Sequence, residues 1–167
     1  LKPVNTVFEF DHQPIQIGAQ NVYWEPKGAF TGEVSVPMLK DVHCTCSIVG
    51  HSERRGYFGE TNEDVNRKVR ALLDGGLYAV ACVGESLSVR DEGGAEEFVC
   101  AQVRAAFAGL EPEEAGKCVV AYEPIWAIGT GRTATPEQAQ DMCAAIRTTL
   151  ADMFGAETAD QMRILYG

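Results

Sequence analysis

The sequence is short of positive charge and of long apolar runs, and each shortage excludes a class of protein. Lys and Arg number 14 against 24 Asp and Glu, so the net charge is −10. An acidic chain is a poor match for broad binding to nucleic acid or to an anionic membrane surface. No apolar run approaches the length of a membrane span, and no signal-peptide pattern opens the chain. We therefore expect no nucleic-acid and no membrane partner, although a few local donors could still hold one phosphate group.

The cysteines lack the paired spacing of a metal or redox motif. None forms a CxxC pair, and the six are Cys44, Cys46, Cys82, Cys100, Cys118 and Cys143. Cys44 and Cys46 would share one face of a strand beside His43, which leaves a metal site as an alternative. Zinc sites usually show tighter paired ligands, so we expect no metal and small, buried, reduced thiols instead. Reduced thiols are typical of a cytoplasmic protein.

The chain also lacks an internal linker or a low-complexity segment, which predicts a single domain over residues 1–167. Apolar strand patterns alternate with helical patterns, and this order predicts an α/β protein with a parallel sheet buried on both faces. Residues 1–13 show no clean period. The expected strands are 15–20, 44–49, 77–83, 118–123 and 163–166, and the expected helices follow Ser35 and cover 62–74, 95–108 and 136–154.

The most informative stretch is Val119–Ala134, with the sequence VVAYEPIWAIGTGRTA. A buried strand ends at Glu123, Pro124 stops the strand, and a glycine-containing tip follows. Thr135 then opens a helix as its N-cap. A glycine-tipped loop between two defined shoulders can move as a lid, and an acid at its base stands where a catalytic group is expected. The alternative interpretation is an ordinary connection with an exposed glutamate.

His51 is the second candidate, because it follows a strand directly and precedes a charged run. The turn 52–55 would begin a short helix whose dipole disfavours a positive imidazole. A neutral imidazole can donate a hydrogen bond to a carbonyl oxygen while Glu123 accepts a proton from the adjacent carbon. The pair therefore suits proton transfer alpha to a carbonyl, whereas the plainer interpretation of His51 is a capped turn with solvated arginines.

Residues 21–35 form a long loop that carries Tyr23, Trp24 and Phe30. Fifteen residues is long for a connection in a compact domain. Loops of this length and this aromatic content are usually functional or part of an interface.

Four stretches together resemble the triosephosphate isomerase family: GAFTGEVS (28–35), VGHSERRGYFGE (49–60), VACVGE (80–85) and AYEPIWAIGTGRTATPEQA (121–139). The resemblance runs in order from about Ile15 to Gly167. It implies a partial (β/α)8 barrel with about five of the eight strand–helix units. It also implies a cofactor-free aldose–ketose isomerase of glycolysis and gluconeogenesis that acts on glyceraldehyde 3-phosphate and dihydroxyacetone phosphate.

The resemblance also implies roles for individual residues. Glu123 matches the general base, His51 the neutral electrophile, Ser52 a substrate-binding residue and Glu53 a supporting residue. Gln20 and Thr31 match a loop that reaches the partner subunit of a homodimer. The residues that match the mobile lid, in which the glycine N–H of Gly129 meets the substrate phosphate, are Pro124, Ile125, Trp126, Ala127, Ile128, Gly129, Thr130, Gly131, Arg132, Thr133 and Ala134.

The sequence departs from the family at both ends. The family's first strand, with its Asn and catalytic Lys, has no counterpart here, nor does the glycine–serine phosphate loop beyond Gly167. A catalytically inactive fragment, or an interaction remnant of the same fold, is therefore the alternative function. Another phosphate-handling barrel enzyme is a weaker alternative, because the lid stretch is unbroken.

Overall fold

The computed structural model describes residues 1–10, 15–128 and 130–167, without the side chains of residues 9 and 10. Within them, five strands form one sheet in the order β1-β2-β3-β4-β5, and every neighbouring pair is parallel. The strands are β1 (Gly18–Ala19), β2 (Cys46–Val49), β3 (Tyr78–Val83), β4 (Cys118–Tyr122) and β5 (Arg163–Tyr166). The predicted α/β class and parallel sheet are confirmed, and this arrangement is consistent with part of a (β/α)8 barrel.

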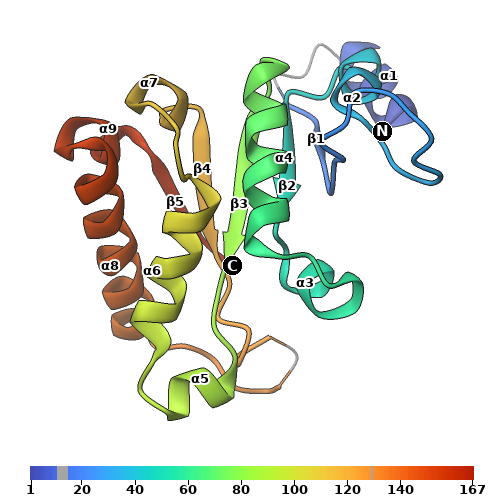
Figure 1. The fold of residues 1–167 in the computed structure, drawn as a ribbon. Coiled ribbons are helices and arrows are strands. Elements are labelled where there is room, and N and C mark those ends of the chain that lie inside the picture. The colour runs from blue at the N-terminus through green and yellow to red at the C-terminus, as the bar shows by residue number, and fades with distance from the viewer. Residues whose placement is uncertain (11–14, 129) are drawn as a thin grey trace.

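Three long helices lie side by side over one face of the sheet (Figure 1). They are α4 (Asn62–Asp74), α6 (Ala95–Ala106) and α8 (Pro136–Phe154), and the bounds of α4 and α8 agree with the sequence prediction. Thr61 and Thr135 each form a complete capping box, with Asp64 and Gln138 respectively. These caps fix where the two helices leave the loops at the carboxyl ends of the strands.

The main apolar core lies between the sheet and these helices. Val120 of β4 and Ile146 of α8 are fully buried there, together with Val69 and Leu72 of α4. The opposite face of the sheet is less covered, because Ile48, Val80 and other alternate strand residues are only half-buried. The prediction of burial on both faces is therefore wrong for the described residues. β2 and β4 alternate between a buried and a half-buried face, as expected where helices cover one side only, whereas β5 at the edge of the sheet is mostly exposed.

Several short helices were not predicted. α1 (Lys2–Phe10) falls in the segment without a clean period, and α5 (Leu87–Asp91) falls between the expected strand 77–83 and the expected helix 95–108. The Ser86 side chain caps α5 by accepting a hydrogen bond from the Val89 N–H, a contact that serine composition alone does not distinguish from a turn. The remaining short helices are α2 (Val36–Asp41), α3 (Ser52–Phe58), α7 (Pro112–Ala115) and α9 (Ala156–Gln161), of which α2 and the start of α3 were expected.

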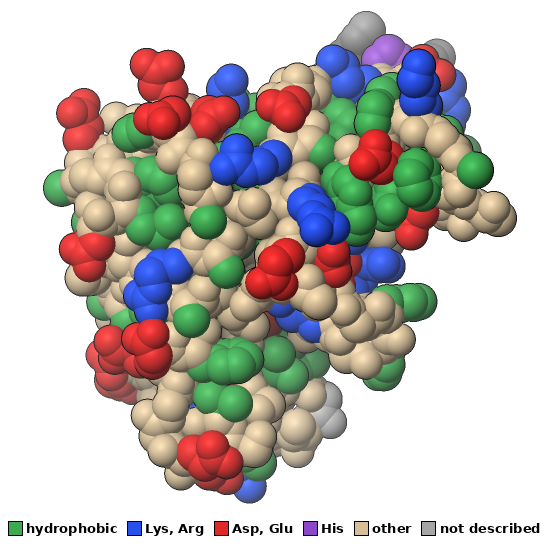
Figure 2. All heavy atoms as spheres, in the orientation of Figure 1, with side chains coloured by type: hydrophobic (Ala, Val, Ile, Leu, Met, Phe, Trp, Pro, Cys, Tyr) green, Lys and Arg blue, Asp and Glu red, His purple; other side chains and the backbone are tan. Residues whose placement is uncertain are grey.

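The two ends of the sheet differ in what surrounds them. α3, α5 and the segment after β4 gather at the carboxyl ends of the strands, in the lower part of Figure 1, whereas α7 and α9 lie at the other end. Figure 2 shows acidic and basic side chains spread over the helix-covered face, with hydrophobic groups between them. In the described part of the chain, no helix combines the length and the apolar character needed to span a bilayer.

Candidate active site

The structure brings His51 and Glu123 together at the carboxyl end of the sheet. Gly50 and His51 follow β2, and Glu123 follows β4, so the two side chains come from strands separated by β3. The distance between His51 Nε2 and Glu123 Oε1 is 2.9 Å. The carboxyl ends of parallel strands are where α/β proteins collect catalytic groups, and the sequence predicted both residues there.

His51 is held by the helix that follows it. It is the N-cap of α3, and its Nδ1 accepts a hydrogen bond from the Glu53 N–H at 3.2 Å. Because Nδ1 accepts, a ring proton belongs on Nε2, which faces the Glu123 carboxylate. This pattern fits the neutral tautomer, and the neutrality of His51 at working pH stays a prediction. The short helix expected after His51 is confirmed.

Ser52 and Glu53 act here through their backbone. The Ser52 N–H donates to Glu123 Oε2 at 3.1 Å, so the two oxygens of Glu123 are held by consecutive residues of one turn. The Glu53 side chain is largely exposed, with Oε2 3.9 Å from His51 Nδ1, while the Glu53 N–H orients the imidazole. The role of Ser52 in substrate binding remains a prediction.

The backbone around Glu123 is tightly enclosed. Its N–H donates to the Val83 carbonyl at 2.8 Å, and a Cβ on Gly84 would lie 1.9 Å from the Glu123 carbonyl oxygen. Gly84 therefore allows a close approach that no other residue permits. The Cys82 thiol lies nearby, and its pKa is raised by burial first and by the Glu123 carboxylate second. A thiol kept protonated adds no second negative charge beside the Glu123 carboxylate.

A buried ion cluster lies behind His51. Glu60 Oε1 accepts from the Gly50 N–H at 2.7 Å, and Oε2 accepts from Arg54 Nε at 2.8 Å and from Lys68 Nζ at 2.5 Å. Lys68 also donates to Asn21 Oδ1 at 2.8 Å. Burial raises the pKa of Glu60, but these hydrogen bonds and the Lys68 charge outweigh burial and hold that pKa below its ordinary value.

The sequence prediction missed this cluster, although one signal was available. Lys68 lies on the same face of α4 as Val65 and Leu72, which are buried. A lysine inside an apolar helical stripe requires a partner when buried. The partner could not be identified without the fold.

A second buried carboxylate holds the first part of residues 124–134, the segment that the sequence predicts to act as a lid (the lid segment). Glu85 is fully buried, and its Oε1 accepts from Trp126 Nε1 at 2.8 Å, from Arg90 Nη1 at 3.0 Å and from Tyr122 Oη at 3.1 Å. The Arg90 guanidinium also lies over the Trp126 ring, 4.5 Å from its centroid. Burial first, and the Glu85 charge second, raise the pKa of Tyr122. The sequence stretch that ends at Glu85 was recognised, but this contact with Trp126 was not.

The tip of the lid segment is more exposed than this shoulder. Ile128 is 49% exposed, and Thr130 Oγ1 donates to the Trp126 carbonyl at 2.9 Å. Gly129, the residue expected to meet a phosphate, lies outside the described residues. Of the predicted order of strand, acid, stiff shoulder, glycine-containing tip and capped helix, the strand, the acid and the capped helix are present, and the tip includes Gly129.

A hollow of about 520 Å³ opens beside His51. Gln20, Ile48 and Tyr57 contribute to its lining, together with Asn21, Glu53, Arg54 and Phe58. Of the two residues expected to contact a partner subunit, Gln20 borders this hollow and Thr31 is exposed in the loop that precedes α2. Tyr23 of the same loop stacks on Trp24 and Phe30, with ring centroids 4.2 and 4.8 Å away.

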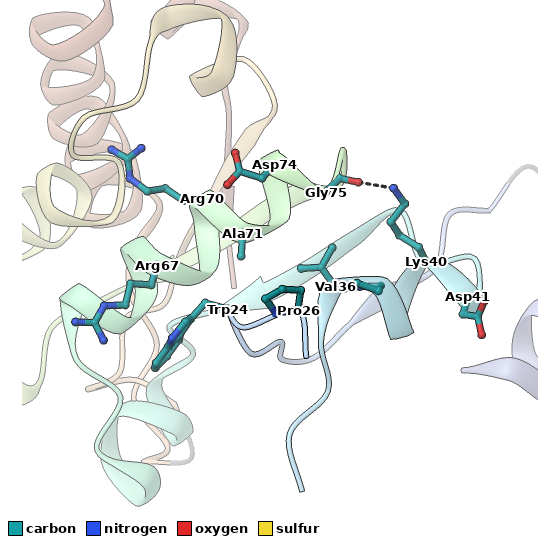
Figure 3. Close-up of a pocket in the computed structure, with 11 residues that line it drawn as sticks. Trp24, Pro26, Val36, Lys40, Asp41, Arg67, Arg70, Ala71, Asp74 and Gly75 are labelled. Carbon is teal, nitrogen blue, oxygen red and sulfur yellow. Dashed lines mark hydrogen bonds between the residues drawn. The ribbon is translucent and has the colours of Figure 1, made fainter. Parts of the chain in front are cut away.

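A larger hollow, of about 840 Å³, lies between α2, α4 and the loop that carries Trp24 (Figure 3) and shares no lining residue with the hollow beside His51. The positively charged side chains that line this hollow already contact other groups of the protein. Lys40 donates to a backbone carbonyl at the end of α4 at 2.8 Å, and Arg70 donates to a carbonyl beyond α6 at 2.7 Å. Arg67 lies over the Trp24 ring. Size alone therefore does not make this hollow the functional site.

The alternative of a metal site has no geometric support. Across residues 1–10, 15–128 and 130–167, no group of three or more His, Cys, Asp and Glu side chains is placed to hold a metal ion. His43 adopts a left-handed conformation, with φ of 59°, and is exposed, whereas the neighbouring Cys44 is buried. All six cysteines are free thiols.

Comparisons with known proteins identify the family of this chain. The sequence model of the family described as triosephosphate isomerase matches residues 1–167, which extends the resemblance to the segment before Ile15. Relatives named triosephosphate isomerase are 59% identical over 154 residues in Chloroflexus aurantiacus, 56% over 154 in Roseiflexus sp. (strain RS-1) and 53% over 153 in Acetivibrio thermocellus. Each match covers 92% of this chain but only 61–62% of the relative, so the chain spans about three-fifths of their length. The chain belongs to the triosephosphate isomerase family.

Proposed function

We propose that the full-length protein carrying this chain interconverts glyceraldehyde 3-phosphate and dihydroxyacetone phosphate without a cofactor. The observation that carries this proposal is the 2.9 Å contact between His51 Nε2 and Glu123 Oε1 at the carboxyl end of the sheet. A carboxylate beside an imidazole N–H is the pair needed to move a proton between adjacent carbons while a carbonyl oxygen is polarised. Family membership and the relatives' names support the same reaction.

In this mechanism the substrate enters between the two side chains. Glu123 accepts a proton from the carbon next to the carbonyl, and the electron pair of that C–H bond moves toward the carbonyl oxygen. His51 Nε2–H donates a hydrogen bond to this oxygen as its negative charge grows, which lowers the energy of the enediolate. The hydroxyl on the deprotonated carbon gives its proton, by way of the His51 imidazole, to the former carbonyl oxygen. Glu123 then returns its proton to the former carbonyl carbon, so that carbonyl and hydroxyl have exchanged places. The Ser52 N–H, which now donates to Oε2, keeps the carboxylate near its working position.

The segment Pro124–Ala134 acts as the lid in this proposal. Its first part is anchored through Trp126 and Glu85, whereas its tip is exposed, so closure would move the tip against a fixed shoulder. The backbone N–H of Gly129 and the Ser52 residue would contact the substrate. A closed lid excludes water, which protects the enediolate and strengthens the hydrogen bonds to it.

We also propose a single domain, a cytoplasmic role in glycolysis and gluconeogenesis, and a homodimer. The aromatic loop 21–35 supports the dimer, because Phe30 at 41% and Val34 at 43% leave apolar surface exposed. Gln20 and Thr31 would lie at that interface. A monomer at micromolar concentration in sedimentation of the full-length protein would contradict this part.

The test is an assay of the full-length protein with each triose phosphate. We expect turnover in both directions and its loss, by at least about 10³-fold, in Glu123→Gln. The exposed residue Glu96 supplies the matched control, Glu96→Gln, which should leave kcat unchanged. A folded full-length protein without turnover would support the alternative, an inactive member of the same fold.

A further inference from the structure

The backbone ladder between β2 and β3 stops just short of the active site. Its last paired residues are Val49 and Ala81. Gly50 then turns away with φ of 71°, and its N–H donates to Glu60 rather than to β3. No ladder bond therefore joins the two strands at the level where His51 begins.

The Arg55 guanidinium occupies this position. Its Nε donates to the Gly50 carbonyl at 2.8 Å, and its Nη2 reaches the Cys82 carbonyl at 3.5 Å. Its Nη1 donates to the Asn62 side chain, at the start of α4, at 2.7 Å. One planar group thus contacts the end of β2, the end of β3 and the helix that covers them.

The fit around the guanidinium is close. A Cβ on Gly50 would lie 3.0 Å from Arg55 Nη2 and 3.1 Å from the Cys82 carbonyl oxygen. Burial lowers the pKa of Arg55, and the charges of Glu60 and Glu123 oppose that shift. All three hydrogen-bond acceptors are uncharged, so geometry rather than an ion pair defines the place of this side chain.

The positions of His51 and Glu123 both depend on backbone atoms that Arg55 contacts. Gly50 immediately precedes His51, and Cys82 immediately precedes Val83, whose carbonyl accepts the Glu123 N–H at 2.8 Å. We propose that Arg55 is a positioning residue that sets the separation of His51 and Glu123 by bridging the ends of β2 and β3. This inference rests on the proposed function of that pair.

The neighbouring arginine has a different place, which makes the assignment specific. Arg54 donates to Glu60 and lies over the Phe58 ring, 4.7 Å from its centroid. It contacts neither Gly50 O nor Cys82 O among the described contacts. The planar guanidinium group of arginine carries several N–H donors that can contact three separated oxygens at once, as Arg55 does. The single ammonium group of a lysine cannot reach all three.

The test compares Arg55→Lys and Arg55→Met in the full-length protein, with Arg104→Met as the control, because Arg104 pairs with exposed Glu97 on α6. We expect kcat to fall by about 10- to 100-fold in both Arg55 variants, with KM within about threefold, because a misplaced group lowers the rate without removing substrate contacts. The control should keep both constants. Where Arg55→Met does not fold, Arg55→Lys provides the result, and folding is checked by urea unfolding.

A second measurement is independent of turnover. The ¹⁵N resonances of the His51 imidazole should shift in both Arg55 variants and stay in place in Arg104→Met. A folded Arg55→Lys variant with kcat within threefold and an unchanged His51 spectrum would overturn the positioning role. If the unmodified full-length protein shows no isomerase turnover, the proposed function fails. The His51 spectrum then still decides the role of Arg55, because an unchanged spectrum contradicts it and a shifted one supports it.

Discussion

Two regions of the molecule are equally buried but are held together by different forces. One region lies under the helices, where apolar side chains are fully buried in one core and need no hydrogen-bond partner. Its members include Val69, Leu72, Val120 and Ile146. At the carboxyl ends of the strands, the buried groups are polar. Glu85 is 0% exposed, and Glu60 and Glu123 are each 8% exposed.

The difference determines what a small change does in each region. The free energy gained by burying apolar surface does not depend on direction and is roughly proportional to the buried area. Removing a methylene group from the core therefore lowers stability without changing the geometry of the site. Hydrogen bonds to a carboxylate need distance and angle, so a lost methylene moves the group out of reach. We expect substitutions in the first region to change the free energy of unfolding and those in the second to change kcat.

The largest expected effect is in the apolar region. Phe107, at the end of α6, is fully buried in the core, and its side chain makes no polar contact among the described hydrogen bonds. Phe107→Ala should lower the free energy of unfolding of the full-length protein by about 3–5 kcal/mol, because it removes a large side chain and leaves a cavity. Urea unfolding measures this, and kcat per folded molecule should stay within twofold. A large fall in kcat with a small loss of stability would break the distinction between the two regions.

The second largest effect is expected at Glu123, which contacts His51. Glu123→Asp withdraws the carboxylate by one methylene from His51 Nε2, now 2.9 Å away, and should lower kcat by about 10²-fold, or about 2.7 kcal/mol of barrier. KM should change little, because the substrate's other contacts remain. Glu96→Asp, on the exposed face of α6, is the control. If kcat of Glu123→Asp stays within a few-fold of the parent, Glu123 is not the base.

The difference between the apolar core and the polar clusters also explains which features could be predicted from the sequence. Apolar periodicity and capping residues are local signals, so the parallel sheet, α4, α8 and the N-cap at Thr135 were predicted correctly. His51 and Glu123 could be placed together because both follow strands of one parallel sheet. Short helices such as α5 depend on a single serine cap, which composition does not separate from a turn.

The polar clusters could not be predicted from the sequence, because their members are far apart along the chain. Glu85 and Trp126 are 41 residues apart, and Lys68 and Asn21 are 47 residues apart. A sequence pattern can show that a carboxylate or a lysine is buried, but the identity of its partner requires the fold. The same holds for Arg55, which looked like part of a solvated charged run and instead bridges β2 and β3.

Tyr122 sharpens the comparison, because it belongs to both regions. Its ring lies in the apolar core with 1% exposure, and its hydroxyl donates to Glu85 at 3.1 Å. Tyr122→Phe removes only the polar part and should cost about 1–2 kcal/mol of unfolding free energy, since Glu85 loses one of its donors. Thermal unfolding of the full-length protein measures this. No loss of stability would mean that Arg90 and Trp126 are sufficient donors for Glu85 Oε1.

The mildest perturbation is a change of pH, which acts on titratable groups and leaves the apolar region uncharged. The pKa of Glu60 is held below its ordinary value of 4.5, because hydrogen bonds from Lys68 and Arg54 outweigh the effect of burial. A carboxylate with a depressed folded-state pKa contributes stability above its unfolded pKa and loses that contribution as pH falls through the folded value. The unfolding free energy should therefore decline as pH is lowered from 5.5 through about 4.5 and below.

Other carboxylates also titrate in this range, so the informative quantity is a difference between two proteins. Glu60→Gln removes the titrating group but keeps a side chain of the same shape, and its stability should lie furthest below that of the parent near pH 6. The gap should narrow as the pH falls below about 4.5, because the parent then protonates Glu60 and loses the same ionic contacts to Lys68 and Arg54. Glu113→Gln, on the exposed first turn of α7, should show no such narrowing. A gap that stays constant from pH 6 to pH 3.5 would mean that the ionised form of Glu60 does not stabilise this region, and that the buried cluster is held as an apolar core is, by shape.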